Sequence, residues 1–574
     1  MRMKKKIIPV LIAIVLICIV GASLILPKIW EKYSYSKERA DLTEYFGVSG
    51  EEAVIFLQDE WLEERALIRD GVLYFTLDTV EKYLEDRFYF NQEEMVLKYT
   101  WPEQVHTVYL SQTPGVIHLA APDGSSQSST ADFGFALAFY ENETLYLAAD
   151  YLNNYCNMSY SIYGQPYRVQ VYTHDDQVTT GTITKATSVR VLGGIKSPIL
   201  TDLKKGDTVV VLNQMETWSE VKTQDGFVGY VENKYLSNVG ETFRQVTVDY
   251  ADPVWPQITR DYKIAMAWHQ VMSKDANSTL TAMTSNADCL NVISPTWLQL
   301  SDNEGNFNSL ASADYVTKAH DLGMEVWVLV DDFTNDIDLY AILSVTEKRE
   351  RLANALVNEV LAVGADGINI DFEKVSTACG PHFAQFLREL SILTHKNGIV
   401  LSVDNYVPEG GSPQYNRKEQ GIVVDYVVIM GYDEHWAGCS TAGSVASIGY
   451  VERGISDTIN CGVPASKIIN GVPFYTRVWE TNGADVSSSA LDMPSVQAWL
   501  EKYNIPIEWD EETCQNYGEL QGTNAIYQVW LEDAQSLQVK FNVMNNYGVA
   551  GMAAWKLGYE TPDIWGLVEA YLNS

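Results

Sequence analysis

Three polar side chains alternate with apolar residues in one short segment of the chain. Between Ile368 and Glu373 the apolar residues alternate with Asn369, Asp371 and Glu373 itself. If this segment is a β-strand, side chains two residues apart project from the same face, so the three polar groups share one face. Two carboxyl groups so near to each other cannot easily both be ionised, so the pKa of one of them is expected to rise. A glutamic acid that stays protonated near neutral pH can protonate a leaving group, and Glu373 is therefore the predicted catalytic acid.

The elements that must position this segment form a repeating pattern from about residue 245 to residue 574. Eight strand-like runs alternate with helical stretches: residues 263–268, 289–300, 324–330, 367–372, 400–403, 426–430, 468–474 and 549–555. This pattern predicts an α/β fold, a (β/α)₈ TIM barrel, whose active site lies at the C-terminal ends of its strands. The last two runs are too far apart for a single crossover helix. We therefore expect a small inserted subdomain at about 478–545, with a hairpin around residues 507–509 and 527–530.

Polar side chains that point into a barrel need an explanation, because such positions normally hold Val, Ile or Leu. Burial of three polar groups is costly unless they bond to one another. A purely structural hydrogen-bond network is one interpretation of Asn369, Asp371 and Glu373. The position of Glu373 at the end of its strand favours catalysis instead.

Four segments, in chain order, resemble glycoside hydrolase family 18, the chitinase-like barrels. The run ADGINIDFE at 365–373 resembles the family's D-x-x-D-x-D-x-E signature. Residues 429–433 resemble its Met-x-Tyr-Asp motif, 467–475 its Gly-x-Pro-Phe-Tyr strand, and 548–555 its final strand ending in Trp. The C-terminal part is most similar to the Gram-positive branch that includes spore-cortex and cell-wall N-acetylglucosaminidases.

The resemblance implies a substrate-assisted reaction on N-acetylglucosamine-containing glycan, either peptidoglycan or chitin-like chains with β-1,4 bonds. Glu373 would protonate the glycosidic oxygen and later activate water, while the substrate's own N-acetyl carbonyl attacks the anomeric carbon. Asp371 would orient the acetamido nitrogen, Tyr432 would bond to the acetamido oxygen, and Trp555 would form an apolar floor. The supporting and substrate-binding residues that we expect in addition are Asn369, Asp366, Met430, Asp433, Tyr475, Arg477 and Trp436.

The chain departs from the family signature at Asn369, where the family has Asp. An amide can still bond to Asp371, but it cannot take up a proton. We therefore expect Asp371 to stay ionised and the pH dependence to shift, without loss of activity. A lectin-like protein without activity and a structural envelope protein are the alternatives, and the presence of Glu373, Asp371 and Tyr432 favours the enzyme.

The N-terminus carries basic residues followed by an uncharged apolar run, from Ile7 to Leu26. Twenty helical residues extend ~30 Å, enough to cross a membrane. We expect a cytoplasmic tail at 1–6, a transmembrane signal anchor at 7–27 and the remainder on the extracellular face. A signal peptide cleaved near Gly21-Ala22-Ser23 is the alternative.

Three regions are expected between the anchor and the barrel. Residues 28–50 are charged and are expected to act as a spacer, and residues 51–178 carry short strands and turns. The latter loosely resemble a small α+β stalk-type domain found beside copper amine oxidases, without its copper-ligating histidines. Residues 183–240 hold five short β runs with Lys-Gly and Asp-Gly turns, and they resemble the small all-β bacterial SH3 domain. That family usually binds cell-wall peptide or glycan, although this copy could also be a spacer.

Composition limits the partners. The formal charge of −35 disfavours nucleic acid and anionic lipid surfaces, so a neutral substrate held by hydrogen bonds and stacking is expected. Seven scattered cysteines show no C-x-x-C spacing, which argues against a disulfide scaffold or a cysteine metal site. We expect no cofactor and no metal.

Overall fold

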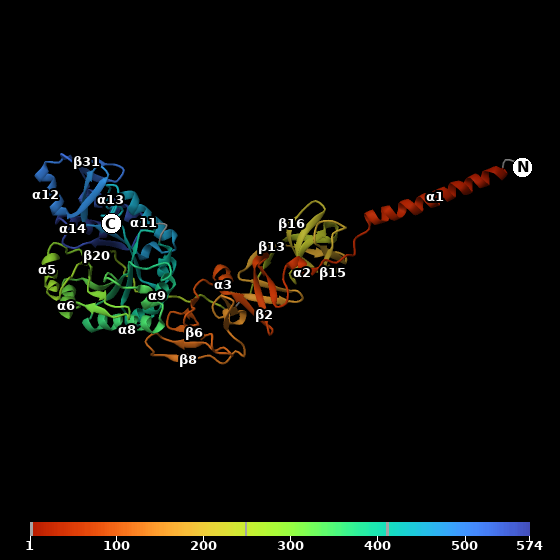
Figure 1. Cartoon of the computed structure of the whole chain (residues 1–574), viewed down its shortest axis with the longest axis horizontal. Coiled ribbons are helices and arrows are strands. Elements are labelled where there is room, and N and C mark those ends of the chain that lie inside the picture. The colour runs from red at the N-terminus through yellow and green to blue at the C-terminus, as the bar shows by residue number, and fades with distance from the viewer. Residues whose placement is uncertain (1–3, 247–249, 409–411) are drawn as a thin grey trace. The chain divides into compact units, whose positions relative to one another are not determined.

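The computed structural model describes residues 4–246, 250–408 and 412–574 (Figure 1). The chain divides into two compact units, which are described separately. One comprises residues 1–88, 110–116 and 132–252, and the other comprises residues 89–109, 117–131 and 253–574. Residues 1–3 of the predicted cytoplasmic tail and residues 247–249 of the predicted barrel segment lie outside the described residues.

The C-terminal unit contains a closed barrel of eight parallel strands. These are β20 (Ile264–His269), β21 (Val292–Pro295), β24 (Glu325–Asp331), β25 (Gly367–Asp371), β26 (Val400–Tyr406), β27 (Tyr426–Met430), β28 (Ile468–Pro473) and β34 (Gly551–Trp555). They pair in this order, and β20 closes the ring by pairing with β34. A short hairpin, β22 (Leu298–Leu300) and β23 (Phe307–Ser309), extends from β24. The predicted barrel is confirmed.

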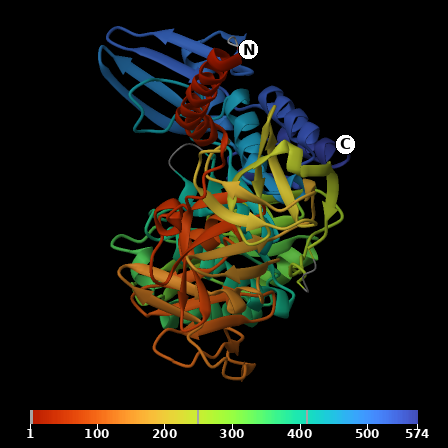
Figure 2. The same ribbon diagram turned by 90° about the vertical axis from the view of Figure 1, so that its right-hand side faces the viewer.

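Helices follow the strands and cover the outside of the barrel (Figure 1), and the last helix is seen in dark blue beside the C-terminus in Figure 2. They are α5 (Leu280–Met283), α6 (Ala313–Asp321), α7 (Leu339–Leu343), α8 (Thr346–Val363), α9 (Gly380–Asn397), α10 (Arg417–Val423), α11 (Ile448–Asn460), α13 (Ala534–Tyr547) and α14 (Asp563–Leu572). Both α8 and α9 end at a glycine with positive φ, Gly364 at 74° and Gly398 at 69°, a backbone conformation that favours glycine. Apolar side chains from strands and helices, such as Ile368, Ile370 and Phe386, form one buried cluster between the two layers.

The expected insertion separates β28 from β34. It is a five-stranded antiparallel sheet with one helix: β29 (Tyr475–Asn482), β30 (Asp485–Asp492), α12 (Met493–Tyr503), β31 (Ile507–Asp510), β32 (Gln515–Gln521) and β33 (Ile526–Trp530). The predicted pairing of the segments around 507–509 and 527–530 is wrong, because β32 lies between them and pairs with both. A small apolar core that includes Val478, Leu500 and Val529 holds the subdomain together.

A second small sheet also belongs to the C-terminal unit. Its strands are β4 (Tyr89–Asn91), β5 (Val96–Thr100), β6 (Val105–Tyr109), β7 (His118–Ala120) and β8 (Gln127–Ser129). It packs on the barrel helices, where Lys98 lies 3.3 Å from Glu389 of α9 and Asn91 donates to the carbonyl of Ser344 at 2.7 Å. The structure thus divides residues 51–178, which the sequence predicts as one domain, between the two units.

The N-terminal unit contains two seven-stranded sheets. The first is formed by β1 (Glu52–Leu57), β2 (Glu60–Arg69), β3 (Val72–Thr76), β9 (Ala138–Glu141), β10 (Thr144–Ala148), β11 (Ser159–Tyr163) and β12 (Tyr167–Tyr172), with the short helices α2 (Leu42–Phe46), α3 (Leu77–Tyr83) and α4 (Ala149–Leu152). The second is formed by β13 (Asp176–Ile183), β14 (Thr187–Arg190), β15 (Ile199–Leu203), β16 (Thr208–Gln214), β17 (Trp218–Lys222), β18 (Val228–Glu232) and β19 (Leu236–Arg244). The second sheet is the predicted SH3-like barrel. Phe46 and Phe56 share a buried cluster with its Val221 and Phe227.

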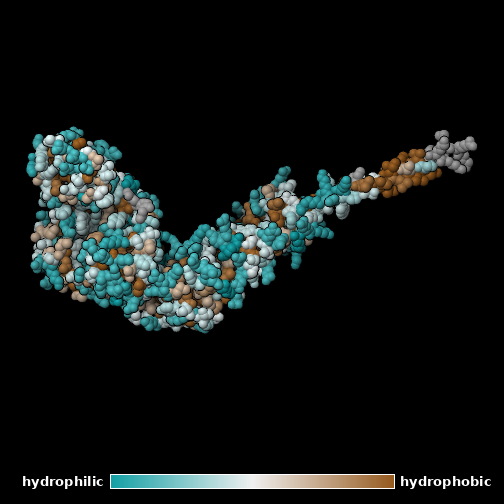
Figure 3. Space-filling view, viewed as in Figure 1, coloured by the Kyte–Doolittle hydropathy of each residue, from teal (hydrophilic) through white to brown (hydrophobic). Residues whose placement is uncertain are grey.

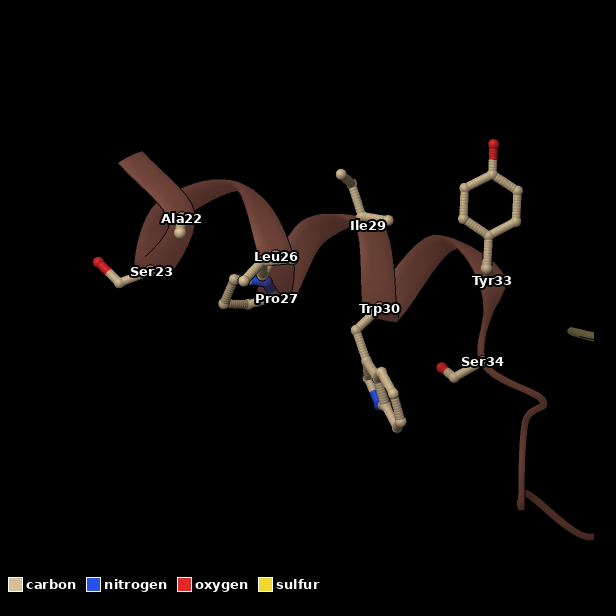
Figure 4. Close-up of a pocket in the computed structure, with 8 residues that line it drawn as sticks. All are labelled: Ala22, Ser23, Leu26, Pro27, Ile29, Trp30, Tyr33 and Ser34. Atoms are coloured by element: carbon tan, nitrogen blue, oxygen red, sulfur yellow. The ribbon is translucent and has the colours of Figure 1, made fainter. Parts of the chain in front are cut away.

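Helix α1 (Lys4–Tyr33) presents an apolar surface along much of its length (Figure 3). The stretch from Ile8 to Tyr33 is long and apolar enough to cross a membrane, a property that a signal sequence near the N-terminus shares. Near the end of the helix, Ile29 and Tyr33 project from one side and Trp30 from the other (Figure 4). Trp30 is 78% exposed, as expected for an aromatic residue at the edge of an apolar span.

Candidate active site

The interior of the barrel changes character along its axis. The part further from the C-terminal ends of the strands is a buried apolar cluster that includes Met266, Leu329, Val428 and Ile469. Toward the C-terminal ends of the strands, the inward positions become polar. The polar side chains on neighbouring strands are Ser294 of β21, Asp331 of β24, Asn369 and Asp371 of β25, and Ser402 and Asp404 of β26. All six are buried, so the polar groups at this end of the barrel are shielded from bulk water.

Three aspartates lie next to one another across adjacent strands. Asp331 pairs in register with Asp371. On the other side, Asn369 pairs with Ser402, which places Asp404 beside Asp371 two residues further along. Neighbouring strands are ~4.8 Å apart, and side chains in register share a face. The carboxyl of Asp371 therefore has an acidic neighbour on each side.

Asn369 is fully engaged in hydrogen bonds. Its amide nitrogen donates to Asp404 Oδ1 at 2.6 Å and to Ser402 Oγ at 3.1 Å. Its amide oxygen accepts from Trp268 Nε1 at 3.0 Å and from Ser294 Oγ at 3.2 Å. Since an amide has two donor hydrogens and two acceptor lone pairs, no bond remains for Asp371. The expectation that Asn369 bonds to Asp371 is therefore wrong, because the amide faces β26 and β20.

Glu373 follows the end of β25 and is half-buried. The buried carboxylate of Asp332 accepts its backbone N–H at 3.1 Å and that of Lys374 at 2.9 Å, which fixes the chain where it leaves the strand. The phenol of Tyr406 donates a hydrogen bond to Glu373 Oε2. The predicted acid is thus held at the C-terminal end of its strand by groups from β26 and from the segment after β24.

The electrostatics favour protonated carboxyls in this cluster. Burial raises the pKa of Glu373, the Tyr406 hydrogen bond partly opposes this, and the charge of Asp332 raises the pKa further. Burial, followed by the charges of Asp404 and Glu373, raises the pKa of Asp371 well above its ordinary value. This environment opposes the expectation that Asp371 stays ionised, because no cation among the described residues offsets its burial beside acidic neighbours.

Aromatic side chains from β20, from β34 and from the loop after β27 pack together near the same ends of the strands. Trp268 of β20 contacts Tyr432 and Trp555, with ring centroids 6.3 and 5.9 Å apart. Gly471 of β28 makes room for this group, since a Cβ there would lie 2.8 Å from the carbonyl of Ile429 and 3.1 Å from the ring of Tyr432. The structure therefore packs both Tyr432 and Trp555 against the buried ring of Trp268.

The loop after β27 and the first inserted strand contact each other. Tyr475 donates to Asp433 Oδ1 at 2.6 Å, and Arg477 Nη2 lies 3.9 Å from the same oxygen. These three predicted site residues thus join the insertion to the loop that carries Tyr432. Trp436, in the same loop, is 56% exposed, and Met430 is buried at the end of β27.

Asp366 lies elsewhere. It precedes β25, whereas Glu373 follows that strand, so the two carboxyls lie at opposite ends. Its Oδ2 bonds to His320 Nε2 at 2.8 Å and accepts the backbone N–H of Val326 at 2.8 Å. These contacts describe a role in holding the start of the strand, although the residue belongs to the sequence motif.

Sequence reasoning missed Asp332, Asp404, Tyr406 and Trp268. A signal for Asp404 was present, since it is a single acid in the apolar run VLSVDNY and its parity matches the inward positions Val400 and Ser402. Asp332 follows another apolar strand directly. Tyr406 and Trp268 carry no comparable signal, because aromatic residues are common in barrel strands for packing alone.

Comparison with known proteins agrees with this geometry. The model of the bacterial SH3 domain matches residues 181–237. The "Putative sporulation-specific glycosylase YdhD" of Bacillus subtilis (strain 168) is 33% identical over 246 residues, which are 41% of this chain and 56% of the relative. The cortical fragment-lytic enzyme of Bacillus anthracis is 30% identical over 273 residues, 45% of this chain and 61% of the relative. The chain thus spans somewhat more than half the length of these relatives.

A solved structure also shares the fold of the C-terminal unit. The crystal structure of the C-terminal domain of a "putative chitinase" from Desulfitobacterium hafniense superposes with a TM-score of 0.50 at 20% identity, over 54% of this chain and 100% of that domain. The family model described as glycosyl hydrolases family 18 matches residues 227–560, which is more than half of the chain. The chain therefore belongs to the glycosyl hydrolases of family 18.

Proposed function

We propose that this protein hydrolyses β-1,4 bonds that follow N-acetylglucosamine residues in a cell-wall glycan, with the acetamido group of the substrate as the nucleophile. The observation that carries the proposal is Glu373, a half-buried carboxyl with a raised pKa at the C-terminal end of the barrel strands, two residues after Asp371. A protonated carboxyl at that position can donate to a glycosidic oxygen.

The reaction proceeds in two steps. In the first, Glu373 protonates the leaving oxygen while the acetamido carbonyl of the bound sugar attacks its own anomeric carbon, which gives an oxazolinium intermediate. In the second, the Glu373 carboxylate takes a proton from water as that water attacks the anomeric carbon, so the β configuration is retained. Asp371 accepts the acetamido N–H and stabilises the positive charge that develops there, and Tyr432 donates to the acetamido oxygen.

The environment suits this chemistry. Substrate binding displaces water from a pocket in which Asp371 already lies buried, so its interaction with the acetamido group is strong. The pKa of Asp371 is raised in the free protein by burial and by its neighbours. An acetamido N–H and a developing positive charge favour the carboxylate form, so substrate binding lowers this pKa. Trp555 forms the apolar floor beneath the sugar, and the buried Trp268 packs against it.

Peptidoglycan is the substrate that the rest of the chain supports best. The SH3-like barrel belongs to a class of domains that bind wall peptides or glycan, and the cortical fragment-lytic relative bears a name that points to wall material. Helix α1 holds the enzyme at the extracellular face of the membrane, next to the wall. The net charge of −35 disfavours anionic polymers such as nucleic acid.

Product analysis tests the proposal. The full-length protein and its Glu373→Gln variant are incubated with purified peptidoglycan, with chitin oligomers and with fully de-N-acetylated chitin, and new reducing ends are identified by mass spectrometry. We expect the wild type to release fragments ending in N-acetylglucosamine, first as the β anomer, and to leave the deacetylated polymer intact. The variant should be about 10²- to 10⁴-fold slower but should still bind glycan. Binding without release by both proteins would replace the enzyme with a lectin-like protein.

A further inference from the structure

The carboxyl that the family signature places at position 369 is absent from this chain, where Asn369 stands instead. The layer of side chains around this position is nevertheless acidic. Asn369 donates to Asp404 Oδ1 at 2.6 Å, so the amide is aimed at a carboxyl on the neighbouring strand β26. Asp404 is 2% exposed and lies beside Asp371 in the register of β25 and β26.

Two oxygens in this layer have no partner. Asp371 Oδ1 and Asp404 Oδ2 are both buried, and neither has a hydrogen-bond partner among the described residues. Buried carboxylate oxygens are rarely left in this state, because the loss of hydration is not compensated. The two orphan atoms belong to adjacent carboxyls, and one shared proton would satisfy both.

The groups that face this pair are almost all acidic. On β24 and after it lie Asp331 and Asp332, and beyond β25 lies Glu373. The cation that approaches this group is Lys374, whose charge acts on Asp331 and Asp332. The phenols of Tyr406 and Tyr432 face the cluster from the remaining sides. Among the described residues no cation lies beside Asp371 or Asp404, so a proton is the natural counter-charge.

Asp404 is a better holder of that proton than Asp331. The carboxylate of Asp331 accepts the backbone N–H of Phe333 at 3.0 Å and Gln299 Nε2 at 3.2 Å, and such donors favour the ionised form. Asp404 accepts Asn369 through Oδ1, which leaves Oδ2 for a proton. Burial first, and the charge of Glu373 in addition, raise the pKa of Asp404 to about 8, against the opposing effect of Asn369.

We propose that Asp404 is a positioning residue that replaces the carboxyl missing at position 369: its Oδ2 and Asp371 Oδ1 share one proton in a hydrogen bond. The inference rests on the proposed function, because Asp371 is the group that meets the acetamido nitrogen of the substrate. With one oxygen held by Asp404, the second oxygen of Asp371 is directed to the substrate as a carboxylate. No bond is made or broken in this arrangement, and the proton stays between the two carboxyls.

Three variants of the full-length protein test this. In Asp404→Asn, the amide can donate to Asp371 as the protonated acid does, but it cannot ionise. We expect kcat near pH 6 to stay within about threefold of the wild type and the alkaline limb of kcat to move to higher pH by about one unit. In Asp404→Ala the donor is lost, and kcat should fall about 10- to 100-fold with KM nearly unchanged. Restoring the carboxyl on the other strand, in Asn369→Asp/Asp404→Asn, should return kcat to within about tenfold of the wild type.

An activity-independent measurement accompanies the kinetics. At pH 6 the infrared carbonyl band of protonated carboxyls should be stronger in the wild type than in Asp404→Asn, and that difference should vanish on titration above pH 9. If the wild type releases no product from any glycan, the proposed function fails, but the infrared difference still decides the state of Asp404. Identical infrared spectra, or an unchanged alkaline limb in an Asp404→Asn protein with wild-type thermal stability, would overturn the assignment.

Discussion

The C-terminal unit buries one carboxyl group next to cations and two others without them, and the pKa values of the two sets shift in opposite directions. Glu389 of α9 is fully buried between the barrel and the small sheet, where Arg349 Nε lies 2.8 Å from one oxygen and Lys98 Nζ 3.3 Å from the other. Burial alone would raise its pKa, but these two cations bring the pKa down to about 2. Asp371 and Asp404 are just as enclosed and have no cation, so their pKa values rise.

The comparison shows what separates a structural acid from a reactive one here. Glu389 is paired on both oxygens, so its charge is fixed and it stabilises the docking of the sheet. Asp371 and Asp404 each have one oxygen whose only proposed partner is the proton that they share, and that proton can respond to a ligand. The partner of a buried carboxyl, and not burial itself, decides between these roles.

The largest expected effect concerns activity. Asp371→Asn should reduce kcat/KM by about 10²- to 10³-fold, because the positive charge that develops on the acetamido group loses its counter-charge. Its free energy of unfolding should be unchanged or higher, since an acid buried among acidic neighbours is replaced by an amide that carries no charge. Glycan-release assays and urea unfolding of the same preparations check both statements. Asp366→Asn, at the other end of the strand, is the control with unchanged kcat, and an equal loss in both variants contradicts the prediction.

The second prediction concerns the free energy of unfolding, which should fall in this variant. Glu389→Ala leaves Arg349 and Lys98 buried without a full counter-charge and should lower the free energy of unfolding by about 3–5 kcal/mol. The half-buried Glu350, 3.4 Å from Lys98, provides the matched control, and Glu350→Ala should cost less than about 1 kcal/mol. Urea denaturation followed by circular dichroism measures both variants. Comparable losses in the two variants would contradict the prediction that the Arg349–Glu389 pair contributes more to stability than the Lys98–Glu350 pair.

The strand pattern predicted much of this site but not its electrostatics. Alternation places Asn369, Asp371 and Glu373 on one face of a barrel strand, and that required only the spacing of apolar residues. The role of Asp404 depends on the register between β25 and β26, which a single sequence does not contain.

The small sheet also contains a contact that could not be predicted from the sequence, between residues far apart in the chain. Lys98 and Glu389 lie 291 positions apart in the chain, and nothing local to either residue indicates that they meet. A strand's own periodicity predicts which face a side chain occupies. The partner across the fold, which sets the charge state, follows from packing between segments far apart in the sequence.

The third prediction separates the two groups by the sign of their pH dependence. Glu389 has its pKa lowered from 4.5 to about 2, so its contribution is present above pH 4.5 and is lost as the pH falls through 2. The excess stability of the wild type over Glu389→Gln should thus shrink by about 3 kcal/mol between pH 5 and pH 2. For Asp404, with a raised pKa, stability relative to Asp404→Asn should instead fall as the pH rises from 4 to 8. Unfolding curves at each pH test this, and parallel slopes in the two comparisons would contradict it.

The smallest expected effect concerns the one hydrogen bond that the side chain of Glu373 accepts from Tyr406. That bond lowers the pKa of Glu373 against the effect of burial, so Tyr406→Phe should raise this pKa and move the alkaline limb of kcat to higher pH. Near neutral pH kcat should change by no more than about fivefold, the value of one hydrogen bond. Tyr415→Phe is the control, since Tyr415 donates to the backbone carbonyl of Phe372 and not to a carboxyl. A shift of the limb in both variants would mean that loss of local packing, and not the bond to Glu373, moves it.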